Sequence, residues 1–367
     1  MKFIVFCAVL LGFTNFLFAQ NYEFTPVVNI GVSSVVSQGK TGTCWSFSTS
    51  SFVESEIERI NGKKIDISEM YTVRTIYDEK AWNYIMRQGK AQFSEGGLAH
   101  DLMNAISSNG IVPQQDFTGL DNDATGHDHT NIVPELKVVL DAYINKDSTV
   151  TNWMESSKVI LDSNLGTYIE TFEYDGKTYT PLEFLAYTQL DPKDYISLTS
   201  FTHKPDYSKF ILNIPDNFSN GSFYNLPLDE YMDVLDRALE NGYTVELDID
   251  VSEPTFSAKK GVAVLPKNKK DNKKALTEIV EELKITQEFR QREFENYNTT
   301  DDHLMHITGI VKDQKGNKYY KVKNSWGSSL ANGGYVYVSD AFMRLKSISI
   351  MIHKDVISKD LKTKLEI

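Results

Sequence analysis

The segment "QGKTGTCWSFS", residues 38–48, constrains this chain most, because it places a cysteine where a loop turns into a helix. After Cys44, apolar residues recur at helical spacing as far as Ile60, and Asn61-Gly62 then gives a stop signal. We therefore expect Cys44 at a helix N-terminus, where unpaired N–H groups and the helix dipole favour a negative charge. Such a position lowers the pKa of a thiol and favours the reactive thiolate.

The first residues have the pattern of a secretory signal peptide. Lys2 precedes an almost wholly apolar stretch, residues 3–19, and the polar "QNYEF" follows. We predict that residues 1–19 are a signal peptide and that the protein is exported, to the periplasm or the extracellular space. An uncleaved membrane anchor is the alternative, although the stretch is short for a span. After cleavage we expect no stable membrane span.

Removal of the signal peptide also removes Cys7 and leaves Cys44 without a partner. Exported proteins usually pair their cysteines. A single remaining thiol indicates an intermolecular disulfide, a reactive group, or a buried cysteine that acts as a small apolar side chain. The context of Cys44 favours the reactive group.

The charge of the chain argues against nucleic acid as a partner. Its 50 acidic and 38 basic residues give a net charge of −12, which provides little attraction for nucleic acid or an anionic membrane. The basic run at 259–274 contains no interleaved aromatic residues, so we expect a solvated loop there. His127 and His129, in the acidic segment 121–132, could bind a metal, but we expect a surface loop and predict no metal or cofactor.

A cysteine nucleophile needs a base, and the best case among the seven histidines is "TTDDHLMHITG". In this segment His303 and His306 lead into a β-rich run, and the residues alone do not choose between them. Downstream, "KYYKVKNSWGSS" predicts a strand and then a turn, with Asn324 at the turn and Trp326 near enough to shield it from water. A cysteine–histidine pair with an asparagine that orients the imidazole is one known solution for acyl transfer.

These motifs, in this order, resemble those of papain-like cysteine peptidases. The resemblance implies that Cys44 is the nucleophile, that His303 is the catalytic imidazole, and that Asn324 orients it. Gln38, six residues before Cys44 (44 − 38), matches the glutamine of the family's oxyanion hole. The role of His306 stays open.

The resemblance also suggests substrate-binding residues. Gly96 and Gly97, in "SEGGLAHDLMN", match the segment whose backbone pairs with an extended substrate, and we group Trp326 with them. One departure is Thr41, which stands where papain-type enzymes carry a structural cysteine, so that disulfide cannot form.

Longer segments are similar to the bleomycin hydrolase / aminopeptidase C branch, notably residues 179–190, 225–251 and the C-terminus. In that branch the chain's own C-terminus lies in the cleft, and its carboxylate holds the free amino group of the substrate. The tail after His353 has 14 residues (367 − 353) and would reach about 46–50 Å if extended. We therefore predict that Ile367 binds substrate and that the enzyme is an aminopeptidase acting on peptides.

Two alternatives to an aminopeptidase remain. One is an endopeptidase on the same fold, and the other is an inactive relative that only binds peptides. The branch also forms hexamers, which makes a homo-oligomer possible.

The resemblance implies an α+β fold with two lobes and the active site in the cleft between them. We predict a helical lobe at about 38–118, with helices at 44–60, 68–88 and 97–109. A large insertion at about 119–245 follows, then a β-barrel-like lobe at about 246–353 and a C-terminal tail at 354–367. With 41% hydrophobic residues in a chain of 367, the sequence has enough apolar material for one large domain of this kind.

Overall fold

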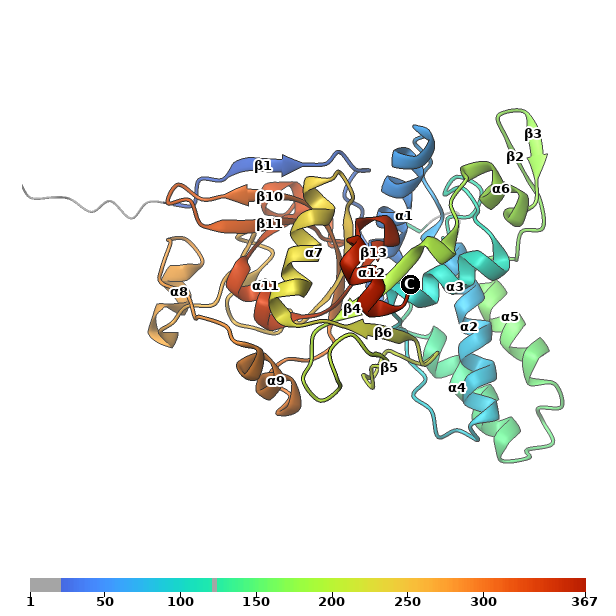
Figure 1. Ribbon diagram of the computed structural model, residues 1–367. Coiled ribbons are helices and arrows are strands. Elements are labelled where there is room, and N and C mark those ends of the chain that lie inside the picture. The colour runs from blue at the N-terminus through green and yellow to red at the C-terminus, as the bar shows by residue number, and fades with distance from the viewer. Residues whose placement is uncertain (1–20, 121–123) are drawn as a thin grey trace, which may run out of the picture.

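The computed structural model describes residues 21–120 and 124–367, so the predicted signal peptide, residues 1–19, lies outside the described residues. Helices gather on one side of the molecule and a large sheet forms the other (Figure 1). This arrangement agrees with the predicted α+β class. Within the described residues, we find no helix that combines the length and the apolar character needed to cross a membrane.

The helical lobe is built on three helices that match the predicted runs closely. Gly62, at a φ of 72°, ends the first of them in the left-handed conformation that glycine adopts without strain. Buried residues on all three helices belong to one hydrophobic core. The helices are α1 (Cys44–Asn61), α2 (Glu69–Met86) and α3 (Ala99–Asn109).

Over residues 21–120 and 124–367 the sheet has eleven strands, and β10 (His303–Lys312) lies near its centre. Its neighbours β7 and β11 are both antiparallel to it, and β1 pairs with its C-terminal half. The strand order is β5-β6-β4-β13-β7-β10-β11-β12-β9-β8. The bounds of the other strands in this sheet are β1 (Thr25–Asn29), β4 (Tyr195–Thr199), β5 (Lys209–Ile211), β6 (Ser222–Asn225), β7 (Val245–Ile249), β8 (Phe256–Ser257), β9 (Val262–Ala263), β11 (Lys318–Lys323), β12 (Tyr335–Ser339) and β13 (Ser347–His353).

Alternate residues of β10 face different helices, as the pleat of a strand requires. Leu304 belongs to the core of the helical lobe, and His306 contacts Ser51 on α1. Met305 and Ile307 belong to a second core, which includes the buried face of α7 (Leu228–Glu240). Helices α1 and α7 therefore cover opposite faces of the sheet at this strand.

The segment that we predicted as an insertion, 119–245, contributes to both lobes. Its first half extends the helical core, and its second half supplies sheet strands and α7. The first half contains α4 (Ile132–Ile144), α5 (Trp153–Leu165), a hairpin of β2 (Phe172–Tyr174) and β3 (Lys177–Tyr179), and α6 (Pro181–Thr188). Shorter helices complete the sheet lobe: α8 (Asn272–Ala275), α9 (Gln287–Glu295), α10 (Ala331–Gly334) and α11 (Asp340–Lys346).

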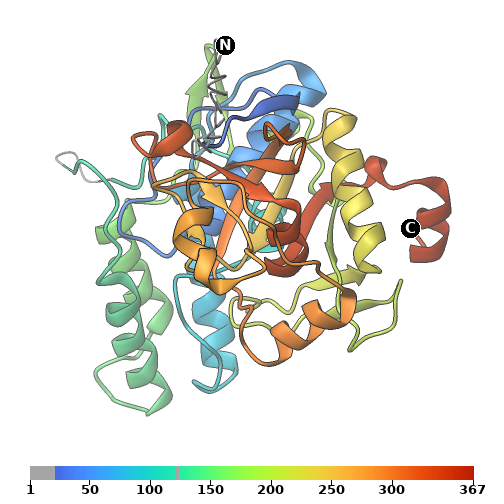
Figure 2. The ribbon, with the colours of Figure 1, turned by 90° about the vertical axis from the view of Figure 1, so that its left-hand side faces the viewer.

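The C-terminal tail, residues 354–367, contains a helix, α12 (Lys359–Leu365), and is therefore not fully extended. Leu361 and Leu365 are buried in the same core as α7, and Lys364 pairs with Glu230 of α7 at 3.0 Å. Figure 2 shows this helix at the outer edge of the molecule.

Candidate active site

Cys44 is the first residue of α1, as the sequence pattern predicts. The first hydrogen bonds of this helix run from the N–H groups of Ser46 and Phe47 to the carbonyl oxygen of Thr43, which leaves the N–H of Cys44 free of the helical ladder. The side chain is 9% exposed. Its sulfur accepts a hydrogen bond from the backbone N–H of Leu304, the residue after His303. The helical lobe and the sheet lobe therefore meet at this thiol.

His303 opens β10 and is oriented by Asn324. Its Nε2 atom lies 2.9 Å from Asn324 Oδ1. The same oxygen accepts a hydrogen bond from the backbone N–H of Ser325 at 2.8 Å, which fixes which end of the amide faces the imidazole. Because that end is an acceptor, Nε2 must donate, and in the neutral ring Nδ1 carries the free lone pair.

Trp326 covers this histidine–asparagine pair. Its ring centroid lies 4.7 Å from that of His303, with the planes inclined by 34°. Trp326 is 38% exposed, whereas His303 and Asn324 are buried. The indole therefore lies between solvent and the hydrogen bond that joins His303 to Asn324.

Gln38 is held beside the start of α1 by both ends of its amide. Its Nε2 donates to the carbonyl of Thr41 at 2.7 Å, and its Oε1 accepts from Ser325 Oγ at 2.6 Å. A backbone hydrogen bond from Gln38 N to the Ser325 carbonyl, 2.8 Å, ties the same two segments together. Within the described residues, Nε2 makes only the hydrogen bond to Thr41, so its second N–H remains for a ligand.

Thr41, which replaces the structural cysteine of papain-type enzymes, is integrated through its hydroxyl. Thr41 Oγ1 donates to the Gln38 carbonyl at 3.0 Å and lies 2.7 Å from Thr43 Oγ1. Hydrogen bonds therefore shape the loop that a disulfide would otherwise constrain.

The protonation states differ from the sequence prediction. Burial, together with the charges of Asp216 and Asp248, raises the pKa of the Cys44 thiol to about 12, although the N–H groups of Leu304 and Trp45 favour the thiolate. Burial lowers the pKa of His303 to about 4, and the bond to Asn324 opposes that shift. The expectation that the helix N-terminus would lower the thiol pKa is wrong here, because loss of hydration outweighs the helix. Burial thus favours the neutral thiol and the neutral imidazole over their charged forms.

Gly96 and Gly97 lie beside this cluster, but their surroundings differ. A Cβ atom on Gly97 would lie 3.1 Å from the ring of Trp45, the residue after the nucleophile. A Cβ atom on Gly96 would lie 2.1 Å from Asp216 Oδ2, so a carboxylate fills the space over this residue. The carbonyl of Gly96 also accepts a hydrogen bond from Lys80 Nζ. The substrate-facing surface at Gly96 is therefore already occupied by the protein's own groups.

Ile367 does not lie with the other predicted site residues. It is 44% exposed, and its N–H bonds to the carbonyl of Lys362 at the end of α12. Helix α12 packs with α7, on the face of the sheet opposite α1 and Cys44. A helix advances 1.5 Å per residue where an extended strand advances about 3.3 Å, so the helical tail has lost most of the reach that the prediction needed.

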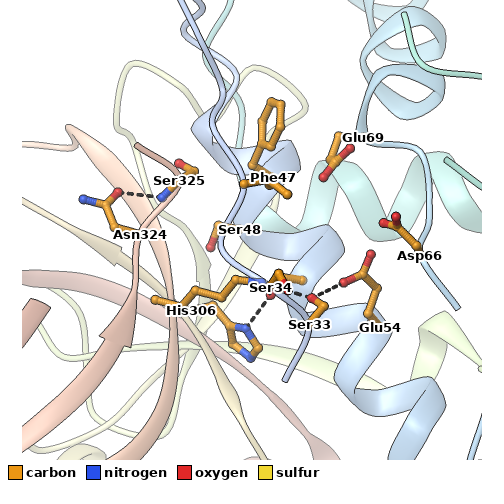
Figure 3. A pocket seen from close by; sticks show the side chains of 13 residues that line it. Ser33, Ser34, Phe47, Ser48, Glu54, Asp66, Glu69, His306, Asn324 and Ser325 are labelled. Carbon is orange, nitrogen blue, oxygen red and sulfur yellow. Dashed lines mark hydrogen bonds between the residues drawn. The ribbon is translucent and has the colours of Figure 1, made fainter. Parts of the chain in front are cut away.

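A polar pocket of about 310 Å³ lies behind the nucleophile, between α1 and the sheet. Figure 3 shows His306 and Ser33 at one end of it and Asn324 with Ser325 at the other. Lys323 Nζ donates to Ser51 Oγ at 2.7 Å and to Ser33 Oγ at 3.0 Å. These contacts hold the residue that immediately precedes Asn324.

His306 belongs to this pocket and not to the catalytic cluster. Its Nδ1 lies 2.9 Å from Ser51 Oγ. Burial and the charge of Lys323 hold the pKa of His306 well below its usual range, so the ring is neutral. Lys323 also donates to Ser33, and Ser33 Oγ in turn donates to Glu54 at 2.5 Å. Sequence reasoning missed Glu54 and Lys323, although Lys323 stands next to Asn324 in the motif.

His127 and His129 are buried beside the loop that leads to Cys44. The backbone N–H of Lys40 donates to the His127 carbonyl at 2.8 Å, and that of His129 donates to the Lys40 carbonyl at 3.1 Å. In the described ranges, no three histidine, cysteine or carboxylate side chains converge in a way that could hold a metal ion. The structure gives these histidines a packing role under the 38–43 loop.

Comparison with known proteins gives two family matches that together span most of the chain. Residues 170–367 match the model of the Peptidase C1-like family, and residues 22–161 match that of the papain family cysteine proteases. An aminopeptidase C from Listeria monocytogenes is 25% identical over 379 residues, covering 90% of this chain and 82% of the relative. The mitochondrial cysteine proteinase 1 of Saccharomyces cerevisiae is 23% identical, covering 97% and 82%.

A solved structure has the same fold. PepW from Lactobacillus rhamnosis superposes with a TM-score of 0.72 at 20% identity, over 93% of this chain and 84% of that one. The first family match alone covers more than half of the chain. It begins just before β2 and runs to the last residue, so it includes the strands that carry His303 and lead to Asn324. With its cysteine at the head of α1 and this histidine–asparagine pair across the cleft, the chain belongs to the Peptidase C1-like family of cysteine peptidases.

Proposed function

We propose that this protein is an exported cysteine aminopeptidase, which removes residues from the free N-termini of peptides through Cys44, His303 and Asn324. The observation that carries the chemistry is the 2.9 Å contact between His303 Nε2 and Asn324 Oδ1, with the sulfur of Cys44 on the N–H of the next residue, Leu304. Several similar proteins are named aminopeptidase C, which supports the exopeptidase assignment.

The protonation states of Cys44 and His303 determine which group gives a proton and which accepts it in each step. As Sγ of Cys44 attacks the scissile carbonyl carbon, the thiol proton passes to Nδ1 of His303, the ring nitrogen that does not face Asn324. The carbonyl π electrons move to oxygen, and the N–H of Cys44 and Nε2 of Gln38 stabilise that oxyanion. His303 then gives its proton to the leaving amine, the C–N bond breaks, and a thioester remains.

Water completes the cycle. It attacks the thioester carbonyl while Nδ1 of His303 accepts its proton. Collapse of this second intermediate breaks the C–S bond, releases the acid product and returns the proton to sulfur. Because Asn324 and Trp326 hold the imidazole in one orientation, the same nitrogen serves in both half-reactions.

The test compares a peptide amide that has a free amino group with its N-acetylated form. An aminopeptidase should cleave the first and spare the second, whereas equal cleavage of both would favour the endopeptidase alternative. That alternative rests on the same catalytic residues, Cys44, His303 and Asn324, and differs only in how the substrate is held.

Labelling distinguishes a peptidase from an inactive peptide-binding relative. Iodoacetamide should modify Cys44 and abolish turnover, and His303→Ala should abolish both turnover and rapid labelling. His203→Ala, an exposed histidine of the sheet lobe, is the matched control and should leave both unchanged. A wild-type protein that neither turns over peptides nor reacts at Cys44 would overturn the enzymatic assignment.

Export is a separate part of the proposal, supported by the apolar segment 3–19. N-terminal sequencing of the protein recovered outside the cytoplasm should begin at Gln20. Recovery of the intact N-terminus in the membrane fraction would instead favour an uncleaved anchor. Formation of a homo-oligomer stays a prediction, which sedimentation of the purified protein would check.

A further inference from the structure

This inference rests on the proposed catalytic function of His303 and concerns the groups that hold this residue in place. We propose that the buried ion pair between Lys346 and Asp250 positions the catalytic imidazole, because it fixes the loop at residues 298–302 that leads directly into His303. Both side chains are buried, so neither reaches the substrate, and both act on the reaction only through His303.

The ion pair joins two segments of the sheet lobe. Lys346 is the last residue of α11, and Asp250 follows the last residue of β7. Lys346 Nζ lies 3.0 Å from Asp250 Oδ2, and the two side chains are 1% and 0% exposed. The backbone N–H of Asp250 also donates to the Lys346 carbonyl at 3.0 Å. Two charges at this depth are stable only where further hydrogen bonds satisfy their remaining donors and acceptors.

The remaining donors of Lys346 reach across to the loop before His303. Its Nζ atom lies 2.6 Å from Glu253 Oε1 and donates to the backbone carbonyl of Asn298. With Asp250, these acceptors account for all three N–H groups of the ammonium. Asn298 lies in the loop between α9 and β10, so Lys346 attaches this loop to the end of β7.

Asp250 attaches the same loop at two further points. Its Oδ2 atom accepts a hydrogen bond from the backbone N–H of Thr300 at 3.2 Å, and its carboxylate is hydrogen-bonded to the carboxyl group of Asp302. The hydroxyl of Thr300 donates to Asp302 Oδ1 at 2.7 Å. Ser252 fixes the other oxygen of Asp250, with its N–H at 2.7 Å and its hydroxyl at 2.6 Å. The orientation of this carboxylate therefore sets the path of the loop.

The hydrogen bond between Asp250 and Asp302 requires one proton, which their surroundings place on Asp302. Burial favours the protonated form of Asp250, but hydrogen bonds from Ser252 and Asp302 and the charge of Lys346 hold its pKa below the usual value. Burial and the contact with Asp250 raise the pKa of Asp302. Asp302 therefore donates to an ionised Asp250. Lys346 thus supports the loop directly at Asn298 and indirectly through this second hydrogen bond.

The strand register places His303 next to this network. His303 pairs with Ile249 on β7, the residue before Asp250. Ser347, the residue after Lys346, pairs with Ile249 from the other side. The histidine, the aspartate and the lysine thus lie within one residue of the same position across three adjacent segments. A change at the ion pair therefore reaches the backbone of His303 over a short path.

The loop and Asn324 fix different parts of His303. Asn324 Oδ1 orients the ring through Nε2, whereas the loop fixes the backbone from which the ring projects. Proton transfer between the imidazole and Cys44 requires both, since a displacement of about 1 Å in a reacting group can lower a rate by about 100-fold.

The test replaces both members of the ion pair, so that no unpaired charge is left in the interior. Lys346→Met/Asp250→Asn should keep a melting temperature close to that of the wild type, since neutral groups of similar size often replace a buried ion pair without loss of stability. Its kcat for the peptide amide with a free amino group should fall by about 10-fold or more, while KM stays unchanged. The rate at which iodoacetamide labels Cys44 at neutral pH should fall as well, because rapid labelling depends on His303.

An ion pair in the same lobe provides the matched control. Lys318 Nζ lies 2.6 Å from Asp236 Oδ2, and Lys318 starts β11, where it pairs with Lys312 at the far end of β10. Lys312 is nine residues from His303 (312 − 303), about 30 Å along the strand. Lys318→Met/Asp236→Asn should leave kcat, KM and the labelling rate at their wild-type values. An equal loss in this control would contradict a specific effect on His303.

The outcomes separate this inference from the proposed function. If the wild-type protein hydrolyses no peptide, the proposed function fails. If the wild type is active and the folded double variant keeps its kcat, the positioning role of the ion pair is refuted while the function stands. If the double variant does not fold, Asp302→Ala, at an exposed position, removes one attachment of the same loop. Its kcat should fall at constant KM, and an unchanged kcat refutes the inference.

Discussion

Nε2 of His303 and Oδ1 of Asn324 lie 2.9 Å apart, and the N–H of Ser325 fixes that oxygen toward the imidazole. We expect Asn324→Ala to lower kcat by about 100-fold, because the imidazole loses the partner that holds it in one orientation. Steady-state kinetics on the free-amine substrate would measure this loss. Asn145→Ala, an exposed asparagine at the end of α4, is the control and should have no effect. An unchanged kcat in Asn324→Ala would contradict the orienting role.

Gln38 provides a test of the oxyanion site. Its amide is held by Thr41 and Ser325, so truncation removes a preorganised donor without disturbing the thiol. Gln38→Ala should lower kcat by about 10²–10³, the usual loss for one oxyanion donor, with little change in KM. A rise in KM at constant kcat would show that Gln38 binds the ground state and transition state equally.

The reactivity of Cys44 should depend on pH in a way set by its surroundings. Because burial, Asp216 and Asp248 raise the thiol pKa to about 12, the thiolate fraction at neutral pH is small and grows as pH rises. The rate of iodoacetamide labelling should therefore climb steadily between pH 6 and pH 9. Asp216→Asn removes one of the charges that raise the pKa, so it should label faster than the wild type at any given pH.

A flat labelling rate between pH 5 and pH 7 would contradict this prediction, since it would indicate a thiolate already formed at low pH. The Asp206→Asn protein should follow the wild-type curve, because that side chain lies at the surface.

Buried neutral histidines should make the fold sensitive to acid. Burial lowers the pKa of His129 to about 4, with a contribution from His127, and it lowers the pKa of His303 to about 4. Because their folded-state pKa values lie below the unfolded value near 6.5, the unfolded chain binds more protons as pH falls. The contribution of these two histidines to the free energy of unfolding should therefore decrease from about pH 6.5 down to about pH 4.

Urea denaturation at a series of pH values would measure this effect. His129→Gln should reduce the slope between pH 6.5 and pH 4, while a variant of the exposed His203 should retain it. A stability that is constant over this interval would show that the buried rings are compensated elsewhere.

The C-terminal helix should contribute to stability and not to specificity. Leu361 is buried against the core that contains α7, so Leu361→Ala should cost about 2–5 kcal/mol in the free energy of unfolding. Leu182→Ala, at a position 51% exposed, is the control and should cost little. Deletion of Glu366 and Ile367 should leave the preference for free amines intact, and its loss would restore the tail as the amine-binding element.

The local parts of the site could be predicted from the sequence because their signals are short-range. The start of α1 at Cys44, its end at Gly62 and the order of His303 and Asn324 all follow from motifs of a few residues. The helical spacing of apolar residues at 44–60 is sufficient to predict the helix that carries Cys44.

The remaining features depend on contacts between distant segments. The approach of Asp216 to Gly96 joins residues 120 positions apart (216 − 96), and no local pattern marks it. The burial that raises the thiol pKa comes from both lobes closing on Cys44, which a helix-dipole argument does not include. The position of the tail could not be predicted, because its helix is stabilised by packing with α7 in the same core, a tertiary effect with no local signal.

The position of Ile367 has a practical consequence. Its side chain is 44% exposed at the end of α12, on the face of the sheet that α7 covers. An affinity tag or a surface linker fused after this residue would project away from the nucleophile. Enzyme immobilised through such a tag should still bind peptides. In an enzyme whose C-terminal carboxylate lined the cleft, the same tag would block the active site.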